Sequence, residues 1–399
     1  MPISSRSAKS QMIRVGIVGA QFAARFHWEG MRRVFAVPIQ IVGVTSRTPG
    51  ARDAFASEKG VQPFQTFDEL CDAVDVIDIC TPPSSHEDLA VRALKAGKHV
   101  IVEKPLTGFY GATVEGFRGN RCSKEQMLRE AFASCNRIRE AAAQSGKFVC
   151  YAENWIYAPS VQKAREILVK SAGQVLWMLG EQSHSGSHSP YYGSWKFSGG
   201  GSLTGKGCHP LSVALYLKRA EGEARDGTPI RPATVSARTH EITRLEAYRD
   251  EGFLRTHYED VEDYAQIHVT FTDGTVADIF ASELVLGGVH NWIEIVANNH
   301  RTRCNLNPIN ALETFNPREE ILKDVYVVEK TNTKQGWSCP APDENWQHGY
   351  AQEFQDFMES IWHSRLPLSG LDLASDVIAA IYAGYLSSER GGAEVEIPR

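Results

Sequence analysis

The segment HVIVEKPLTG, residues 99–108, ends an apolar run on side chains that can do chemistry. The run stops at Glu103, Lys104 and Pro105, as expected for a buried strand that ends in an acid, an amine and a rigid turn. In an open parallel sheet, ligands bind at the carboxyl ends of the strands, so we expect Lys104 to stand where a cofactor and a substrate meet. A lysine there can donate, accept or relay a proton if burial lowers its pKa. The alternative is an ordinary surface lysine after a strand.

A second group of reactive residue types lies in EQSHSGSHSPYYGSWKFSGGGSLTGKGCHP, residues 181–210. Three successive glycines lead to Lys206, His209 and Pro210, and proline is common at the start of a helix. A histidine at a helix entry can act as a general acid or base near neutral pH.

The same segment holds two further histidines and several aromatic residues. His184 and His188 are four apart, a metal-binding spacing on a helix, but the intervening Ser-Gly-Ser favours a loop, and we expect no metal site. Trp195, with Tyr191 and Tyr192, forms either an aromatic wall against a sugar face or part of the core.

The turn GIVGAQFAA, residues 16–24, indicates a dinucleotide site. Gly16 and Gly19 are placed where a first strand turns tightly into a helix, whose N-terminal amides can hold a pyrophosphate. Counted from Gly19, the usual fingerprint has glycines at positions 21 and 24, where this chain has Gln21 and Ala24. Alanine is an accepted substitute for close packing, whereas Gln21 is a departure that puts a side chain near the phosphates.

Two other strand ends bear on the cofactor. The second strand ends in Thr45, Ser46 and Arg47, without the acid that usually holds the ribose hydroxyls of NAD. Ser46 and Arg47 suit the 2′-phosphate of NADP; alternatively, Ser46 binds the ribose and Arg47 covers the adenine of NAD. Both cofactors therefore stay open. After the third long strand, a loop with Thr81 and Pro82 leads to His86, which either lies beside the nicotinamide or caps the next helix.

The elements that must position these residues alternate between strands and helices up to about residue 150. Continuous Val/Ile runs predict buried strands at 13–19, 39–46, 74–81 and 99–104, with helices at 22–35, 85–97 and 127–145 and an inserted polar loop at 112–126. This alternation predicts a doubly wound parallel sheet.

The remaining residues follow a different pattern. Segments 174–184, 236–243, 265–281 and 291–301 read as strands, with hairpin turns at Asp273-Gly274 and Asn298-Asn299. Helices are expected at 163–170, 345–363 and 371–388, and residues 306–342 read as irregular. We therefore predict an α/β protein with a dinucleotide-binding domain at 1–150 and a substrate-binding and oligomerisation domain at 151–399, built on a large, mostly antiparallel open sheet.

Length and composition exclude several classes of protein. A chain of 399 residues with 42% hydrophobic and 23% charged residues is typical of a globular protein of two domains. A net charge of −6 with interspersed signs argues against a nucleic-acid surface, and no apolar run is long enough to span a bilayer. The eight cysteines form no CxxC pair, and the polar N-terminus does not resemble a signal peptide, so we expect a cytoplasmic protein.

Four segments together resemble the Gfo/Idh/MocA oxidoreductases, the family of glucose–fructose oxidoreductase and inositol dehydrogenase. They are GIVGAQFAA, TPPSSHEDLAVRALKAGKHVIVEKPLT, SGGGSLTGKGCHP and GYAQEFQDFMESIWHS. The resemblance implies a Rossmann domain followed by an α/β domain whose open sheet makes a homodimer or homotetramer. It also implies reversible hydride transfer between NAD or NADP and the hydroxyl-bearing carbon of a sugar, sugar derivative or cyclitol.

Within this resemblance, Lys104 matches the lysine of the family's EKP motif, and His209 matches its catalytic histidine. The family usually has Asp four residues before that histidine, where this chain has Gly205, and Lys206 follows it. Lys206 therefore either takes over the proton relay or binds an anionic substituent. Nearby positive charge, from the nicotinamide and Lys206, is expected to lower the pKa of Lys104.

The predicted site residues fall into three overlapping groups. The catalytic residues are Lys104, His209 and Lys206. The cofactor-binding residues are Gly16, Gly19, Gln21, Phe22, Ser46, Arg47, Thr81, Pro82, His86, Glu103 and Lys104. The substrate-binding residues are Lys104, Glu153, Tyr157, His184, Trp195, Lys196, Lys206 and His209.

The alternative activity is a redox-neutral glycoside hydrolase that keeps its NAD. It would oxidise a ring hydroxyl, eliminate the aglycone, add water and reduce the ketone. The many candidate proton-transfer groups near His209 suit such a sequence, and the lysines suit a sulfonated or carboxylated sugar. A protein that only senses the dinucleotide is a third possibility, less consistent with Lys104 and His209.

Overall fold

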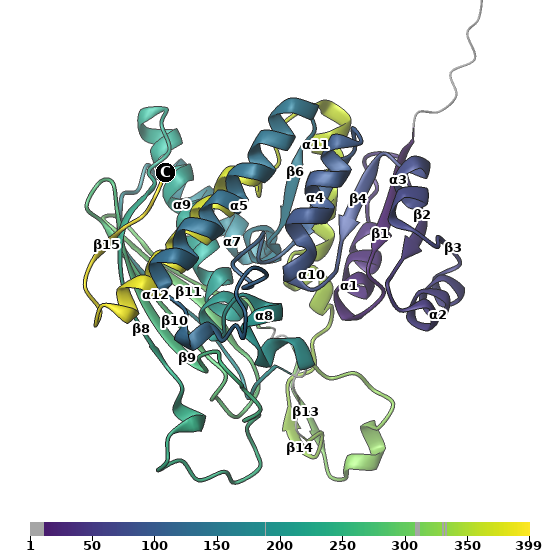
Figure 1. The fold of residues 1–399 in the computed structure, drawn as a ribbon. Coiled ribbons are helices and arrows are strands. Elements are labelled where there is room, and N and C mark those ends of the chain that lie inside the picture. Colours follow the sequence, from purple (N-terminus) through teal and green to yellow (C-terminus); the bar gives the residue numbers. More distant parts are fainter. Residues whose placement is uncertain (1–11, 188, 308–311, 329–330, 332) are drawn as a thin grey trace, which may run out of the picture.

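The computed structural model describes residues 12–187, 189–307, 312–328, 331 and 333–399. Two sheets lie side by side, each with helices packed against it (Figure 1).

The first sheet has six parallel strands in the order β3-β2-β1-β4-β5-β6. This is the strand order of a doubly wound dinucleotide-binding fold. Val15, Ile77 and Ile101 in its middle strands are fully buried, as their β-branched runs predict. The strands are β1 (Ile13–Val18), β2 (Ile39–Thr45), β3 (Gln62–Pro63), β4 (Val76–Ile79), β5 (His99–Glu103) and β6 (Val149–Ala152).

The helices of this half connect successive strands. Helix α3 begins with a capping box in which Thr66 and Glu69 bond each other's backbone amides, and α5 ends at Gly146 with φ of 66°. These helices are α1 (Phe22–Met31), α2 (Pro49–Lys59), α3 (Phe67–Ala73), α4 (His86–Lys95) and α5 (Lys124–Ser145).

The second sheet has seven strands in the order β12-β11-β7-β10-β9-β8-β15. All its pairs are antiparallel except β7 with β10, so the predicted mostly antiparallel sheet is confirmed. The expected turns at Asp273-Gly274 and Asn298-Asn299 join β9 to β10 and β11 to β12. The strands are β7 (Val175–Ser183), β8 (Pro232–His240), β9 (Tyr264–Phe271), β10 (Val276–Ser282), β11 (His290–Ala297), β12 (Arg301–Asn305) and β15 (Val395–Glu396).

The C-terminal helices return to the first half of the chain, where α11 packs on α1 and α12 packs on α5. The boundary near residue 150 stays a prediction. The helices of the second half are α6 (Asn154–Tyr157), α7 (Pro159–Lys170), α8 (Trp195–Ser198), α9 (Cys208–Asp226), α10 (Glu344–Gln347), α11 (Tyr350–His363) and α12 (Leu371–Glu389).

Two expected elements differ in the structure. The helix predicted at 345–363 is two helices that are separated at Gly349, which adopts φ of 88°. Only glycine fits at this position, because an added Cβ would lie 2.4 Å from the Asn154 carbonyl. The segment predicted to be irregular, 306–342, contains a hairpin of β13 (Thr314–Asn316) and β14 (Gly336–Ser338) among its described residues.

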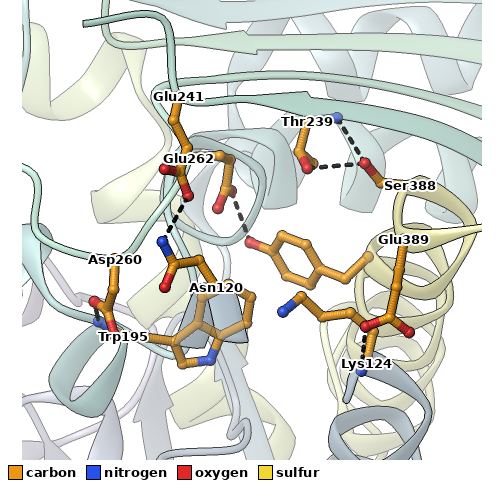
Figure 2. A pocket seen from close by; sticks show the side chains of 10 residues that line it. Asn120, Lys124, Trp195, Thr239, Glu241, Asp260, Glu262, Ser388 and Glu389 are labelled. Carbon is orange, nitrogen blue, oxygen red and sulfur yellow. Dashed lines mark hydrogen bonds between the residues drawn. The ribbon is translucent and has the colours of Figure 1, made fainter. Parts of the chain in front are cut away.

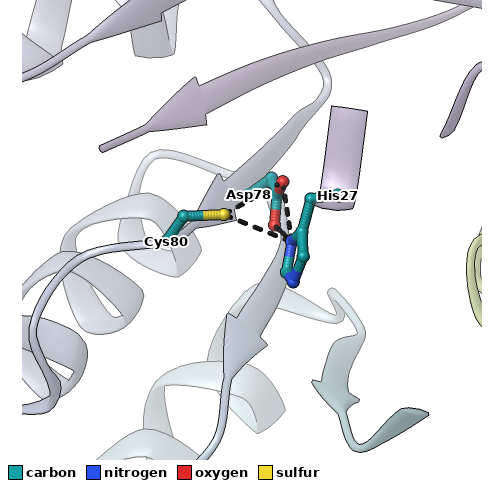
Figure 3. Close-up of side chains that lie close together, drawn as sticks. All are labelled: His27, Asp78 and Cys80. Carbon is teal, nitrogen blue, oxygen red and sulfur yellow. Dashed lines mark hydrogen bonds and ion pairs between the residues drawn. The ribbon is translucent and has the colours of Figure 1, made fainter. Parts of the chain in front are cut away.

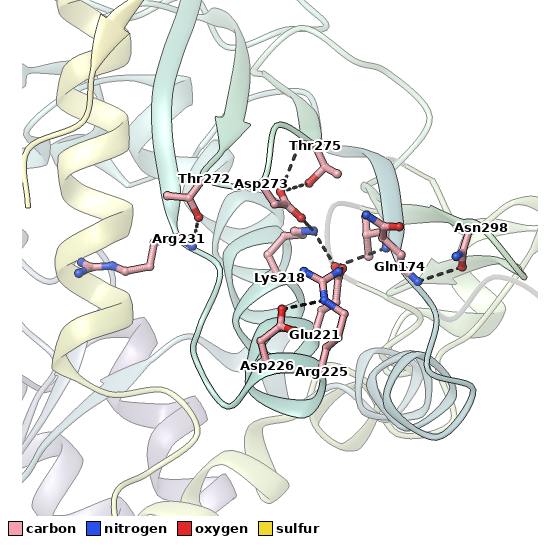
Figure 4. A network of polar contacts seen from close by, with 11 residues as sticks. Gln174, Lys218, Glu221, Arg225, Asp226, Arg231, Thr272, Asp273, Thr275 and Asn298 are labelled. Carbon is pink, nitrogen blue, oxygen red and sulfur yellow. Dashed lines mark hydrogen bonds and ion pairs between the residues drawn. The ribbon is translucent and has the colours of Figure 1, made fainter.

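A buried ionic network fixes the far end of α9. Lys218 is fully buried, and its Nζ donates to Glu221 Oε2 at 2.6 Å and to Asp273 Oδ2 at 2.9 Å (Figure 4). Arg225 donates to the other oxygen of Glu221 at 2.9 Å. The network ties this end of α9 to the β9–β10 turn and so fixes the helix against the second sheet there.

Among the described residues, no helix has the length and apolar character needed to cross a membrane.

Candidate active site

Lys104 lies at the carboxyl end of β5, on the edge of the first sheet that faces the second domain. Its half-buried side chain crosses to that domain, where Nζ donates to the Gly205 carbonyl at 2.9 Å. The ring of Tyr192, in the short turn η3 (Pro190–Gly193), has its centroid 5.8 Å from the same Nζ. Lys104 therefore stands at the meeting point of the two domains, as its position in the sequence predicts.

The acceptor of this hydrogen bond belongs to a π-helical turn, η4 (Leu203–Gly207), that leads into α9. In a π turn, the helical donor to the Gly205 carbonyl would be the amide of residue 210. Pro210 has no N–H, so the carbonyl is left to accept from Lys104. A Cβ at Gly205 would lie 3.2 Å from the ring of Tyr192, which fills the space beside this backbone.

His209 is the second residue of α9 and forms a dyad with Glu153. The imidazole is 5% exposed, stacks on Trp155 at 5.4 Å, and places Nδ1 2.5 Å from Glu153 Oε1. Its Nε2 has no hydrogen-bond partner among the described residues. Glu153 follows β6 and is fully buried, and its Oε2 has no partner in the described part of the chain. Sequence reasoning placed Glu153 at the substrate; the structure places it behind His209.

The protein's own groups hold Lys104 as an ammonium ion. Burial lowers the pKa of Lys104, but Tyr192, Cys208, Glu103 and Glu153 outweigh burial and raise it well above its usual value. The expected lowering of this pKa by nearby positive charge is therefore wrong for these surroundings. Lys206, the cation expected to cause it, is paired with a carboxylate.

The Lys206 ammonium lies in a buried ion pair with Glu283, and it also donates to Ser187 Oγ at 3.3 Å. Lys206 and Glu283 are both almost fully buried. The charge of Lys206 is thus offset within the protein, which leaves it poorly suited to bind an anionic substituent.

The remaining predicted substrate residues lie at different places. The Tyr157 hydroxyl is in the core, where it donates to Asp356 at 2.8 Å, and the exposed Lys196 lies beside the Phe197 ring. His184 is buried and accepts from the Gly186 amide at 3.1 Å. His188 lies outside the described residues.

Trp195 lines a separate pocket of about 310 Å³, together with Lys124, Glu262 and Tyr385 (Figure 2). Glu262 accepts from the amides of Gly201 and Leu203 and from the Tyr385 hydroxyl, so it anchors the glycine segment that leads into the π turn. Burial raises the pKa of the Glu262 carboxyl to about 7. The indole of Trp195 is buried in this anchoring region and donates to the Phe109 carbonyl at 3.1 Å, and its contact with a substrate stays a prediction.

The glycine turn fits a dinucleotide. Gly19 has φ of 110°, and a Cβ there would lie 2.4 Å from the Cys80 carbonyl, so only glycine is accommodated. Its amide donates to Thr45 at the end of β2. Gln21 and Phe22 are exposed at the start of α1, and no side chain caps that helix, so its first amides can receive a pyrophosphate. Ser46 and Arg47 follow at the adjacent strand end.

The structure differs from two expectations about the cofactor side of the site. Gly16 lies inside β1 instead of in the turn, and its missing Cβ leaves room for Leu70, which would be 2.7 Å away. His86 is fully buried at the start of α4, with Nδ1 2.8 Å from the Pro105 carbonyl and Nε2 2.9 Å from the Thr81 carbonyl. It therefore links the loop of Thr81 and Pro82 to the EKP segment and does not cap the helix.

Sequence reasoning assigned Tyr192 to an aromatic wall or to the core and not to Lys104, and it missed two contributors behind Glu103, His27 and Asp78. Weak signals existed for the last two. Asp78 interrupts the apolar run VDVIDIC, and His27 falls on the buried face of α1 with Ala24 and Met31. Polar residues at such positions are seldom buried without a partner.

Comparison with known proteins identifies the family of this chain. Residues 13–117 match the model of an oxidoreductase family with an NAD-binding Rossmann fold, and residues 161–301 match the GFO/IDH/MocA C-terminal domain. The chain belongs to the Gfo/Idh/MocA oxidoreductase family. Its first domain is accordingly an NAD-binding Rossmann domain, as the four segments predicted.

Similar proteins include curated dehydrogenases and solved structures. The chain is 33% identical to UDP-N-acetylglucosamine 3-dehydrogenase of Acidithiobacillus ferrooxidans over 95 residues, an alignment that covers 24% of this chain and 29% of the relative. It is 26% identical over 224 residues to levoglucosan dehydrogenase of Pseudarthrobacter phenanthrenivorans, which covers 52% and 51%. The alignments thus span about half or less of these relatives. Over the full length of both chains, the structure is similar to GenD2 from gentamicin A biosynthesis in complex with NAD, with a TM-score of 0.77 at 22% identity.

Proposed function

We propose that the protein is a nicotinamide-dependent oxidoreductase that transfers a hydride to or from the hydroxyl-bearing carbon of a sugar, sugar derivative or cyclitol. The observation that carries the proposal is that the Lys104 ammonium, at the end of β5, bonds the turn that leads into α9, where the His209–Glu153 dyad lies, and that Glu153 is among the charges acting on Lys104. The relatives named above act on sugars, which supports the substrate class.

When bound, the dinucleotide supplies the carbon that accepts or returns the hydride. The residues of this chain handle the proton. In oxidation, His209 Nε2 takes the hydroxyl proton while Glu153, at Nδ1, stabilises the imidazolium that forms. The Lys104 ammonium donates a hydrogen bond to the same substrate oxygen and orients it. In reduction, the proton returns from His209 to the carbonyl oxygen.

The uncapped first turn of α1 and Gly19 would hold the pyrophosphate, and Ser46 with Arg47 would contact the adenosine ribose. Arg47 is exposed, which suits either a 2′-phosphate or stacking on adenine. Comparing KM for NAD and NADP in the wild type and in Arg47→Ala separates these roles. A rise in KM for NADP alone assigns Arg47 to the 2′-phosphate.

The test of the proposal is turnover. Wild-type protein is mixed with NAD or NADP and a panel of sugars, cyclitols and p-nitrophenyl glycosides. Accumulation of reduced nicotinamide, lost in Lys104→Met while dinucleotide binding survives, is the expected result. Full turnover by Lys104→Met would refute the assignment. Release of nitrophenol with only catalytic NAD would instead establish the glycoside hydrolase, which stays a prediction without a specific supporting contact.

The partner and location also stay predictions. The open face of the second sheet exposes Leu176 and Trp177, at 45% and 40%, and suits a second copy of the chain. Sedimentation of the wild type as a dimer or tetramer would confirm this. A cytoplasmic location remains the expectation from the sequence.

A further inference from the structure

A buried group of alternating acids and bases lies directly behind Lys104. His27, from α1, is fully buried, and its Nδ1 lies 2.9 Å and 3.1 Å from the two carboxylate oxygens of Asp78 on β4. Its Nε2 lies 3.1 Å from Glu103 Oε1 at the end of β5. The Cys80 sulfur approaches the same Nδ1 at 3.2 Å (Figure 3).

These distances fit a charged ring between two carboxylates. A neutral imidazole has one N–H and can donate to only one carboxylate, whereas an imidazolium donates to both. Burial lowers the pKa of His27, but the Asp78 carboxylate and the Cys80 thiol outweigh burial, so the pKa lies well above its usual value. Burial raises the pKa of Glu103, but its hydrogen bond from His27 and the nearby His27, Lys104 and His209 lower it. The cation on His27 thus keeps Glu103 ionised.

Glu103 connects His27 to Lys104 through its two carboxylate oxygens. While Oε1 faces His27, Oε2 accepts the backbone amide of Lys104 at 2.8 Å. The Lys104 side chain in turn reaches Gly205 of the second domain. An unbroken series of contacts therefore runs from Asp78 through His27 and Glu103 to the backbone of Lys104, the residue whose side chain reaches the second domain.

Other titratable groups face the two ends of this series. At His27 they are Asp78 and Cys80 from β4 and its exit, Glu103 from β5, and Glu353 from α11, whose own pKa is raised well above the usual value, first by burial. At Lys104 they are Tyr192, Cys208, Glu103 and Glu153.

We propose that His27 is a positioning residue for Lys104: by holding Glu103 as a carboxylate, it fixes the backbone of Lys104 and keeps a negative charge beside the ammonium group. The importance of this for catalysis rests on the proposed function. The effect of His27 on Glu103 and Lys104 is a property of the folded protein and can be measured without a substrate.

The first experiment compares how readily Lys104 loses its proton between pH 7 and 8, expressed as an apparent acid–base midpoint. Acetic anhydride labels the unprotonated amine, and mass spectrometry of the peptide that contains Lys104 gives the labelling rate at each pH. In His27→Gln, Glu103 loses its cation and takes up a proton in this pH range, so the apparent midpoint for Lys104 should fall by about one pH unit, which corresponds to roughly tenfold faster labelling. Glu103→Gln should produce the same shift directly.

Matched variants separate this effect from loosened packing. His27→Gln/Asp78→Asn removes the cation together with its outer anion, so it should fold even if the single variant does not, and it should show the same shift. His268→Gln removes another His–Asp pair, 2.8 Å long, on the second sheet and should leave the midpoint unchanged. A folded His27 variant that is labelled at the wild-type rate, or that is labelled faster by the same factor at about pH 10, where Glu103 is ionised again, overturns the proposal.

The second experiment needs no substitution. Nitrogen-15 NMR of histidine-labelled wild-type protein reports the protonation of both ring nitrogens of His27. Signals of an imidazolium that persist above pH 8 are expected. A neutral tautomer of His27 at pH 7 would overturn the proposal, because one of the two carboxylates would then lack a donor.

These readouts do not depend on turnover. If the midpoint shifts as expected but no sugar or cyclitol is oxidised, the positioning role of His27 is supported and the proposed function is refuted. If Lys104→Met abolishes turnover but the His27 variants leave the Lys104 midpoint in place, the proposed function is supported and the positioning role of His27 is refuted.

Discussion

Glu153→Gln tests whether the carboxylate behind His209 drives proton removal. The substitution keeps the size of the side chain and an oxygen that can accept from Nδ1, so the orientation of the imidazole should survive. What it removes is the negative charge 2.5 Å from the ring. The effect on rate therefore measures how strongly that charge stabilises the imidazolium formed when the substrate loses its proton.

The structure gives the expected size. The centres of charge of the ring and the carboxylate are roughly 4 Å apart, and at an effective dielectric constant of about 20 their attraction is at most about 4 kcal/mol. The glutamine dipole retains part of this, so we expect a loss of about 2 to 3 kcal/mol in the transition state. That corresponds to a fall in kcat of roughly 30- to 150-fold.

The assay follows reduced nicotinamide in single turnovers with any sugar or cyclitol that the wild type oxidises, so that product release does not mask the chemical step. Glu353→Gln is the matched control. Glu353 is also fully buried, neither of its oxygens has a partner in the described structure, and burial raises its pKa, so an uncharged amide resembles its native state. If Glu153→Gln stays within about threefold of the wild type, or both variants lose the same rate, His209 does not act through Glu153.

Four further outcomes are expected. Lys104→Met should abolish turnover and leave dinucleotide binding, measured by fluorescence titration, within about threefold of the wild type. Lys206→Met should lower the free energy of unfolding by about 3 kcal/mol in urea titrations, and Lys206→Met/Glu283→Gln should recover most of it with wild-type kcat; loss of turnover by the folded double variant would restore Lys206 to a catalytic role. The raised pKa of Glu262, about 7 in the folded protein against about 4.5 unfolded, disfavours folding once the carboxyl ionises, so this group contributes about 3 kcal/mol more stability at pH 4.5 than above pH 7. The wild type should therefore lose stability relative to Glu262→Gln as the pH rises through this window, and a pH-independent difference would contradict the assignment. Lys218→Ala should destabilise the protein by about 3 kcal/mol or more, because it leaves two buried acids without their cation, and calorimetry that shows no change would contradict the network in Figure 4.

The parallel arrangement of the first sheet could be predicted because its strands are short, buried on both faces and separated by helices. The runs ending at Thr45 and at Glu103 are apolar enough to exclude other readings. The hairpin turns at Asp273-Gly274 and Asn298-Asn299 carried a local signal, since the turn chemistry lies in the turn residues themselves.

The break between α10 and α11 could not be predicted in this way. Gly349 is needed because α6, almost 200 residues earlier in the sequence, packs against that backbone, with the Asn154 carbonyl 2.4 Å from where a Cβ would lie. A contact between distant segments leaves no periodic pattern in either one.

The active site shows the same difference between local and distant determinants. Positions set by a strand end or a glycine turn, such as Lys104 and Gly19, were predictable from local order. The state of a charge was not, because it depends on partners brought from elsewhere. The sequence alone suggests that Lys206 is a reactive lysine, but the structure pairs it with Glu283. The pKa of Lys104 rises because Tyr192 and Cys208, and then two acids, Glu103 and Glu153, lie around it.

The partner of Lys104 in the second domain is a main-chain carbonyl, exposed by a π turn and by a proline without an amide hydrogen. Point mutations at position 205 cannot delete that oxygen, however they alter the side chain. A residue with an amide hydrogen at position 210 would instead offer the oxygen a helical donor that competes with Lys104. The link between the two halves of the enzyme thus tolerates a change in the side chain of the residue that carries the carbonyl and depends on a proline five residues further along the chain.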